Sequence, residues 1–271
     1  MGEKRNMPGN LNHSSKRRKG GPGKPWQQPR KGAIESGEWG VFVTCDMGRE
    51  SKCIRETLDV FSQNVEDAAE QKDDDEDDGD EDDDDIEAQI RREIEGLQTS
   101  KTKSRPFSAT QLDIPCVTFV RLDKSIEPVE LVHRLCTEAQ ANPEKKSSRY
   151  IKRMTPVTEI RKTLSVDLEA FAREILKPHF HSGGPPKKYA ILPTLRGNDK
   201  FKRDPVIKTI ADVVGPEHPV DLKNYDLMIL VTVVQNVIGM SVVGSDYDKL
   251  KRYNLAEIYD PSPKPTAETK S

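Results

Sequence analysis

The sequence predicts an α+β fold, and three observations carry this prediction. Between residues 39 and 154, short apolar runs alternate with helical patterns. The last third ends in two apolar runs, residues 227–234 and 237–243, joined only by Gln235 and Asn236. Their almost continuous apolar character indicates adjacent strands that are buried on both faces at the centre of a sheet. With 34% hydrophobic and 33% charged residues, part of the 271-residue chain is predicted to stay outside any core.

Three segments are predicted to be disordered. Residues 1–36 form a basic tail, with nine Lys or Arg against one Glu in the first 31 positions. An acidic insertion spans residues 66–85, and 12 of the chain's 46 acidic residues lie within residues 73–85. Residues 260–271 are rich in Pro, Lys, Thr and Ser. The net charge of −3 therefore hides a chain that is basic outside its acidic insertion.

The first part of the ordered chain, residues 39–136, is predicted to alternate strands and helices. In the first helix, Cys53, Ile54, Leu58 and Phe61 recur at helical spacing. The four cysteines form no C-x-x-C pair and lie in apolar patterns, which favours reduced core thiols over disulfides or zinc. In chain order, the expected elements are strand 39–45, helix 49–61, helix 86–97, strand 116–122 and helix 128–139, followed by strand 149–154.

The last third is predicted to contain two helices and three strands. A helix begins near Leu168 and ends before the basic loop at residues 177–188. A strand follows at residues 189–195, and Pro193 favours a place at the sheet edge. Asp204 and Pro205 are expected to cap and open the next helix, which precedes the two buried strands.

Several classes of function lack their signatures. No run reaches the roughly 18 to 20 apolar residues that a membrane span needs, and the N-terminus lacks the apolar segment of a secretory signal, so we expect a soluble intracellular protein with no membrane partner. No G-x-x-x-x-G-K-[ST], G-x-G-x-x-G or G-x-S-x-G motif is present. His179 and His181 lack neighbouring ligands for a metal. We expect no catalytic residues, no metal and no cofactor.

Basic residues on loops and strand ends remain as candidates for binding RNA phosphates. Tyr150, Phe180 and Phe201 lie among them and could stack on unpaired bases. The alternative is an ordinary charged exterior with these rings in the core. The candidate RNA-binding residues are Lys152, Arg153, Lys187, Lys188, Arg196, Lys200, Lys202 and Arg203.

Particular segments give a family resemblance. The order of the basic loop after Leu195, a helix, VDLKNYDLMILVTVV and VIGMSVV resembles a THUMP domain over about residues 137–245. The resemblance implies a ferredoxin-like part before this domain, from about Trp39. The segments CVTFV, RYIKRMTPVT, KPHFH and KRYN resemble, more narrowly, the stand-alone THUMP proteins that serve as tRNA acetylation adaptors in fungi.

The resemblance implies a binding protein that is not itself an enzyme. Its members bind serine and leucine tRNAs and partner an RNA cytidine acetyltransferase, which holds the acetyl-CoA and ATP sites and forms N4-acetylcytidine. Two alternatives stay open: a tRNA-modifying enzyme in its own right, or an interaction protein in ribosome biogenesis that uses its acidic segment. The cluster Lys16-Arg17-Arg18-Lys19 could be a nuclear or nucleolar signal, an RNA contact or a solvated tail. We expect a nuclear or nucleolar protein, with the cytoplasm as a further location.

Overall fold

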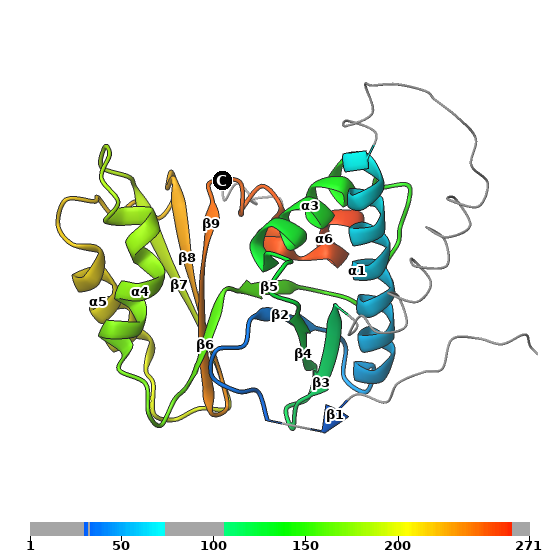
Figure 1. Cartoon of the computed structure of the whole chain (residues 1–271), viewed down its shortest axis with the longest axis horizontal. Coiled ribbons are helices and arrows are strands. Elements are labelled where there is room, and N and C mark those ends of the chain that lie inside the picture. Colours follow the sequence, from blue (N-terminus) through cyan, green and yellow to red (C-terminus); the bar gives the residue numbers. More distant parts are fainter. Residues whose placement is uncertain (1–29, 32, 74–105, 262–271) are drawn as a thin grey trace, which may run out of the picture.

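The computed structural model describes residues 30–31, 33–73 and 106–261. Two β-sheets and their helices make up this part of the chain (Figure 1). The first sheet is built mainly from the N-terminal half, and the second from the C-terminal half. Four predicted segments lie outside the described residues: the basic tail up to residue 29, the acidic run from residue 74, the helix at residues 86–97 and the tail from residue 262.

The first sheet has the strand order β1-β3-β4-β2-β5, and all neighbours are antiparallel except β1 and β3. The predicted strand at residues 39–45 is confirmed as β2, and the one at residues 116–122 as β4. Neither β1 nor β3 is predicted, because one is two residues long and the other alternates polar residues with small or apolar ones. The bounds are Arg30–Lys31 (β1), Gly40–Thr44 (β2), Phe107–Gln111 (β3), Val117–Leu122 (β4) and Met154–Val157 (β5).

Two helices pack on one face of this sheet, α1 (Glu50–Asp73) and α3 (Pro128–Ala141). The apolar positions predicted for the first helix lie on its packed side, where Cys53, Ile54 and Phe61 are buried. The helix is much longer than the predicted residues 49–61. Cys45, Cys53 and Cys136 are buried free thiols, whereas Cys116, also predicted to lie in the core, is half-buried.

The predicted strand at residues 149–154 is wrong, because the strand β5 begins only at Met154. The backbone before Met154 instead forms hydrogen bonds to one carboxylate oxygen, Oε1 of Glu56. This oxygen accepts hydrogen bonds from the backbone N–H groups of Arg149 (2.9 Å), Tyr150 (2.8 Å) and Ile151 (3.1 Å). Backbone donors that are satisfied by a side chain do not need a neighbouring strand.

The second sheet has the order β6-β9-β8-β7, with β7 parallel and β9 antiparallel to β8. The two apolar runs form the predicted central hairpin around Gln235 and Asn236, and nearly every residue of both strands is buried. Pro193 lies on the edge strand β7, as predicted. The bounds are Glu159–Lys162 (β6), Tyr189–Arg196 (β7), Leu227–Val234 (β8) and Val237–Gly244 (β9).

Two helices cover the outer face of the second sheet, α4 (Leu168–Phe180) and α5 (Arg203–Val214) (Figure 1). Two predictions about them are wrong. The helix α4 continues through Pro178 to Phe180, whose buried ring packs edge-on against Tyr189 at 5.6 Å. Its burial gives the last turn tertiary contacts that offset the helix-breaking tendency of the proline.

The second error concerns the start of α5. Its N-cap is Lys202, without a side-chain capping bond, and Asp204 lies in the first turn. The segment after β9 forms a short 3₁₀ turn, Lys251–Tyr253, and the helix α6, Leu255–Tyr259, which packs beside α3 (Figure 1). The last helix of the described residues thus ends at Tyr259.

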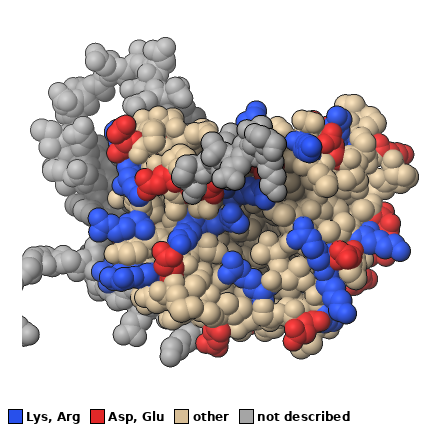
Figure 2. Space-filling view, turned by 180° about the vertical axis from the view of Figure 1, so that it is seen from behind, with Lys and Arg blue, Asp and Glu red and all other residues tan. Residues whose placement is uncertain are grey.

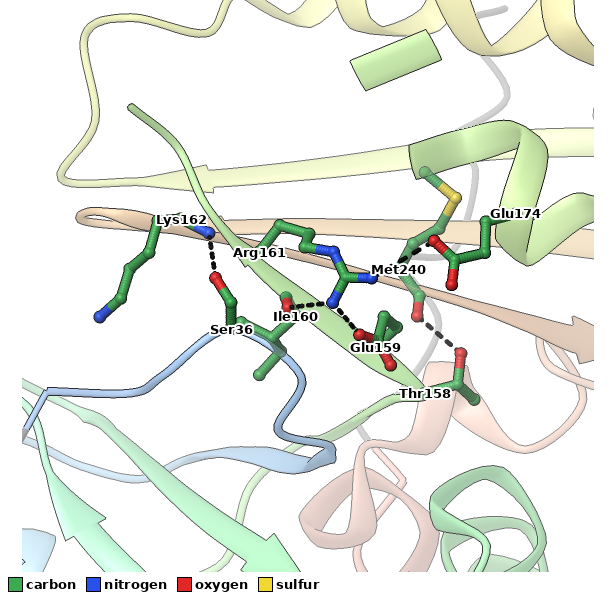
Figure 3. A network of polar contacts seen from close by, with 8 residues as sticks. All are labelled: Ser36, Thr158, Glu159, Ile160, Arg161, Lys162, Glu174 and Met240. Carbon is green, nitrogen blue, oxygen red and sulfur yellow. Dashed lines mark hydrogen bonds and ion pairs between the residues drawn. The ribbon is translucent and has the colours of Figure 1, made fainter. Parts of the chain in front are cut away.

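The chain crosses between the sheets at Thr158, where β5 leads directly into β6. The backbone N–H and the hydroxyl of Thr158 both donate to the carbonyl oxygen of Met240 at 3.0 Å (Figure 3). Gly239 beside it allows the close approach, because a Cβ there would lie 2.3 Å from Cγ1 of Val157. The boundary predicted between residues 136 and 137 falls inside α3, whereas the sheets change at Thr158.

Candidate nucleic-acid interface

The eight predicted RNA-binding residues lie in three separate places. Arg196 is the last residue of β7, and Lys200, Lys202 and Arg203 follow it, whereas Lys187 and Lys188 precede its start. A strand rises about 3.3 Å per residue, so the two groups lie roughly 23 Å apart at opposite ends of the second sheet. Lys152 and Arg153 lie in the first part of the molecule, immediately before β5.

The end of the second sheet after β7 is where β6, β7 and β8 all terminate. Arg196 is paired with Val234, and Lys162 with Val237, across the same hairpin. The ammonium of Lys200 donates to the carbonyl oxygens of Thr163 and Leu164 in the loop after β6. These contacts place residues from three segments at one sheet end.

The loop between β7 and α5, residues 197–202, is held rigidly. Gly197 has φ +60°, and a Cβ there would lie 3.0 Å from Cδ1 of Ile114 in the first part of the molecule. The side chain of Asn198 donates through Nδ2 to the carbonyl of Gln235 at 2.6 Å and accepts through Oδ1 from the backbone N–H of Phe201 at 2.9 Å. A fixed loop presents its charges without a large ordering cost on binding.

Within the described residues, Arg196, Lys202 and Arg203 are exposed and form no side-chain hydrogen bond or ion pair. Two exposed carboxylates, Asp199 and Asp204, lie in the same segment and reduce its positive charge. The uncapped first turn of α5 adds backbone N–H groups and the positive end of the helix dipole. This surface can therefore accept phosphate groups without first breaking an ion pair.

The two lysines at the opposite end of the sheet are already engaged. Lys187 donates through its ammonium to the carbonyl of His179 at 2.9 Å and through its backbone N–H to Nδ1 of His218 at 3.0 Å. Burial, and then the charge of Lys187, lower the pKa of His179. Lys188 pairs with Asp221 at 3.4 Å. These contacts make the second end of the sheet a structural junction.

His218 is the centre of that junction. Its ring is buried, and because Nδ1 accepts from Lys187, Nε2 carries the proton and donates to the carbonyl of Phe180 at 3.1 Å. The ring also meets that of Phe180 edge-on at 5.0 Å. The expectation that Phe180 could stack on RNA is therefore wrong, because this ring is part of the core.

The two remaining candidates, Lys152 and Arg153, differ in whether their side chains are already paired. Lys152 forms an ion pair with Asp46. Arg153 is exposed, and among the described residues its guanidinium has no hydrogen bond or ion pair, although its backbone pairs with Asn254. The predicted residues on β7 and its following loop thus form one surface, and the others do not join it.

The sequence prediction misses two basic residues of β6. Arg161 lies between Glu159 and Glu174, 3.3 Å from the latter (Figure 3). Lys162 pairs with Glu35 at 3.3 Å. Both are bound to carboxylates and support the sheet edge.

Across the rear of the molecule, Lys and Arg side chains form a band around a central hollow (Figure 2).

The described residues contain no group of three or more His, Cys, Asp and Glu side chains that could hold a metal. His179 lies in the last turn of α4, and His181 contacts the carbonyl of Val214 at 3.3 Å. No described helix has the length and apolar character of a membrane span.

Comparison with known proteins assigns the class. A model of the THUMP domain matches residues 165–243, which run from the loop before α4 to the end of β9, so this part of the chain is a THUMP domain. The match starts later than the predicted residue 137. It includes the loop of Arg196 and excludes the first sheet.

Relatives across most of the chain identify the family. The tRNA acetyltransferase TAN1 of Saccharomyces cerevisiae is 31% identical over 96% of this chain and 96% of its own length. A Schizosaccharomyces pombe protein described as uncharacterized is 35% identical over 85% of this chain and 79% of its own. The chain belongs to the family of THUMP-domain proteins that includes TAN1.

A solved structure resembles part of the chain. The THUMP domain of THUMP domain-containing protein 1 is 28% identical over 31% of this chain and 87% of that domain, with a TM-score of 0.27. THUMP domain-containing protein 1 of Mus musculus is 30% identical over 89% of this chain and 68% of its own length.

Proposed function

We propose that this protein binds tRNA and presents it to an RNA cytidine acetyltransferase for N4-acetylcytidine formation in serine and leucine tRNAs. Membership of the TAN1 family supports a role in tRNA acetylation. The observation that carries the binding role is the loop after β7, where Arg196, Lys202 and Arg203 are exposed and unpaired within the described structure. Unpaired cations on a rigid loop suit phosphate contacts.

The catalytic step is assigned to the partner in this proposal. The described basic surface offers charge for holding a nucleic acid. The alternative is that the chain transfers the acetyl group itself. The name tRNA acetyltransferase carried by TAN1 favours this second candidate.

One reconstitution separates the two candidates. Purified chain, acetyltransferase, tRNA, ATP and acetyl-CoA are combined in full and with each protein omitted, and nucleosides are measured by mass spectrometry. The adaptor role predicts acetylcytidine only when both proteins are present. Acetylcytidine formed by this chain alone would contradict it, and formation by the acetyltransferase alone at the full rate would show that no adaptor is needed.

Serine and leucine tRNAs are the proposed substrates, and a third tRNA serves as the control. If all three are acetylated equally, the proposed selectivity is wrong even when the adaptor role holds. We further propose a nuclear or nucleolar location, because the first 31 residues carry nine Lys or Arg. Removing residues 1–31 should then shift a tagged protein to the cytoplasm, and an unchanged location would contradict this.

A further inference from the structure

A pocket of about 330 Å³ lies at the end of the first sheet, away from the loop after β7. It lies where β2 and β3 begin and β4 ends, so backbone from three strands frames it. Its size is at the lower end of the range for small-ligand sites. Polar and aromatic side chains line it, among them Glu38, Trp39, Ser108, Arg121, Asp123 and Lys124.

The indole of Trp39 is held in a fixed orientation in this pocket. Its Nε1–H donates to the carbonyl of Asp123 at 3.2 Å, and its backbone carbonyl accepts from Leu122 at 3.3 Å. The next residue, Gly40, has φ +158°, and a Cβ there would lie 2.1 Å from the carbonyl oxygen of Val120. Only glycine allows this approach of β2 to β4, so the backbone beside the ring cannot shift freely.

The ring is covered by a cation that can move. The ammonium of Lys124 lies 4.4 Å from the centroid of Trp39, and the lysine side chain is exposed. An exposed cation–π contact is weak, because water screens the ammonium. A flat ligand can therefore displace this ammonium from the ring and keep it nearby as a counter-charge.

The polar groups of the pocket suit a nucleotide. Arg121 is fixed by Glu38 at 3.2 Å, which places a guanidinium and a carboxylate side by side. Asp123 accepts from the backbone N–H and hydroxyl of Ser125 at 3.0 and 2.8 Å, and these bonds lower its pKa so that it stays ionised. Carboxylates accept from the exocyclic amino groups of bases, and cations attract phosphates.

The pocket is connected to the second sheet through the segment before β2. The backbone N–H of Gly37 donates to the carbonyl of Ile160 at 2.9 Å, and the hydroxyl of Ser36 accepts from the backbone N–H of Lys162 at 3.1 Å (Figure 3). Ser36 and Trp39 are three residues apart, at most about 11 Å along the chain. The loop after β6, which Lys200 contacts, follows Lys162 directly.

We propose that this pocket stacks one unpaired, amino-bearing base of the bound RNA on Trp39, with the ammonium of Lys124 beside its phosphate and Arg121 holding Glu38 in place. The proposal rests on the RNA-binding function proposed above and adds a second contact on the first sheet. Adenine and cytosine fit the carboxylates of Glu38 and Asp123, whereas uracil offers no amino group there.

Tryptophan fluorescence tests this contact directly, because the chain has only two tryptophans. In a Trp26→Phe background, Trp39 is the sole reporter. Single-stranded oligo(A) and oligo(C) should quench it, oligo(U) much less, and free AMP should require a far higher concentration. RNA binding is followed independently by the anisotropy of a labelled strand, so a silent fluorophore is distinguished from absent binding.

Substitutions in the pocket provide a second test of the stacking contact. Stacking on an aromatic ring generally contributes enough that its loss lowers affinity about fivefold or more. Trp39→Leu should show that loss for oligo(A), Trp39→Phe should retain most of the affinity, and Lys145→Ala, an exposed lysine outside the pocket, should show none. Thermal melting of each variant checks folding, and Arg121→Ala tests the pocket without changing the ring.

The outcomes separate this inference from the proposed function. RNA binding by anisotropy with unquenched Trp39, or with unchanged affinity in both Trp39→Leu and Arg121→Ala, overturns the pocket and leaves the function intact. Equal quenching by AMP and by oligo(A) shows a free-nucleotide site and also overturns it. If the unsubstituted protein does not bind any RNA, both proposals fail.

Discussion

Basic residues lie at both ends of the second sheet, but they differ in whether they have partners inside the fold. We call the end after β7 the free end and the end before β7 the engaged end. After β7, Arg196, Lys202 and Arg203 are free of side-chain partners within the described residues. Before β7, Lys187 and Lys188 are bound to His179 and Asp221. The presence of positive charge does not distinguish these ends. What distinguishes them is whether each cation already has a partner inside the fold, because a paired cation must give up that contact to bind a phosphate.

The largest expected effect is on stability, at the engaged end. His218→Ala leaves the backbone N–H of Lys187 and the carbonyl of Phe180 without their partner and opens a cavity beside the Phe180 ring. We expect a loss of about 3 kcal/mol in the free energy of unfolding, measured by urea denaturation. The exposed His181→Ala is the control and should change stability much less. Equal effects of the two substitutions would contradict the role of His218 as the centre of the junction.

The second prediction compares charge reversal at the two ends. Arg196→Glu with Arg203→Glu should lower tRNA affinity about tenfold or more and leave the melting temperature nearly unchanged, because neither side chain has a partner within the described residues. Lys187→Glu with Lys188→Glu should clearly lower the melting temperature and change tRNA affinity much less, because these lysines are bound inside the fold.

A matched control accounts for net charge alone. Arg49→Glu with Lys145→Glu makes the same charge change at exposed positions of the first part that have no side-chain partner in the described structure. Filter binding and differential scanning fluorimetry measure the two quantities for all three double variants. If the control weakens binding as much as the Arg196 and Arg203 pair, the localised surface is wrong.

A smaller effect is expected from the rigidity of the free end. Asn198→Ala removes the hydrogen bonds to the carbonyl of Gln235 and from the backbone N–H of Phe201, so the loop must be ordered on binding. A net hydrogen bond is worth about 1 kcal/mol, which corresponds to roughly a fivefold loss of tRNA affinity. Asn198→Asp keeps the acceptor for Phe201 but sets a carboxylate oxygen against the Gln235 carbonyl and adds a negative charge, so it should lose more affinity than Asn198→Ala. Wild-type affinity in Asn198→Ala would show that the loop is ordered by other contacts.

The smallest effect is a pH dependence at the engaged end. The pKa of His179 lies below its usual value of 6.5, because burial and the charge of Lys187 disfavour the protonated ring. The unfolded chain then binds this proton more readily, so stability is full above about pH 6.5 and falls as the pH decreases below it. His179→Gln should narrow the difference in melting temperature between pH 7.5 and 5.5. An unchanged difference would assign the pH dependence to other groups.

The sequence predicts the elements whose signals are local. The hairpin of β8 and β9 is evident from continuous apolar residues, and Pro193 correctly indicates an edge strand. By contrast, β6 escapes prediction because it is four residues long and carries Arg161 and Lys162, whose contacts come from α4 and from the segment before β2. The error at residues 149–154 has the same cause, since Glu56 lies far away in the sequence.

The sequence predicts the candidate surface only where its signals are local. Glycine and basic residues after a strand indicate a charged loop, and the structure places Arg196, Lys200, Lys202 and Arg203 there. Nothing local reveals that Lys187 faces the carbonyl of His179, or that Lys152 pairs with Asp46. Pairing depends on the tertiary arrangement, and so does the pocket around Trp39, which requires Arg121 and Asp123 from another strand.

The central claim is that tRNA phosphates contact the free end of the second sheet. The most direct test is tRNA affinity as a function of salt concentration for the unsubstituted protein, the Arg196→Ala and Arg203→Ala double variant, and an Arg49→Ala and Lys145→Ala control. Each lost phosphate contact reduces the slope of log K against log salt by about 1. The account predicts a slope shallower by about 2 for the first double variant only. Identical slopes for all three proteins would contradict it.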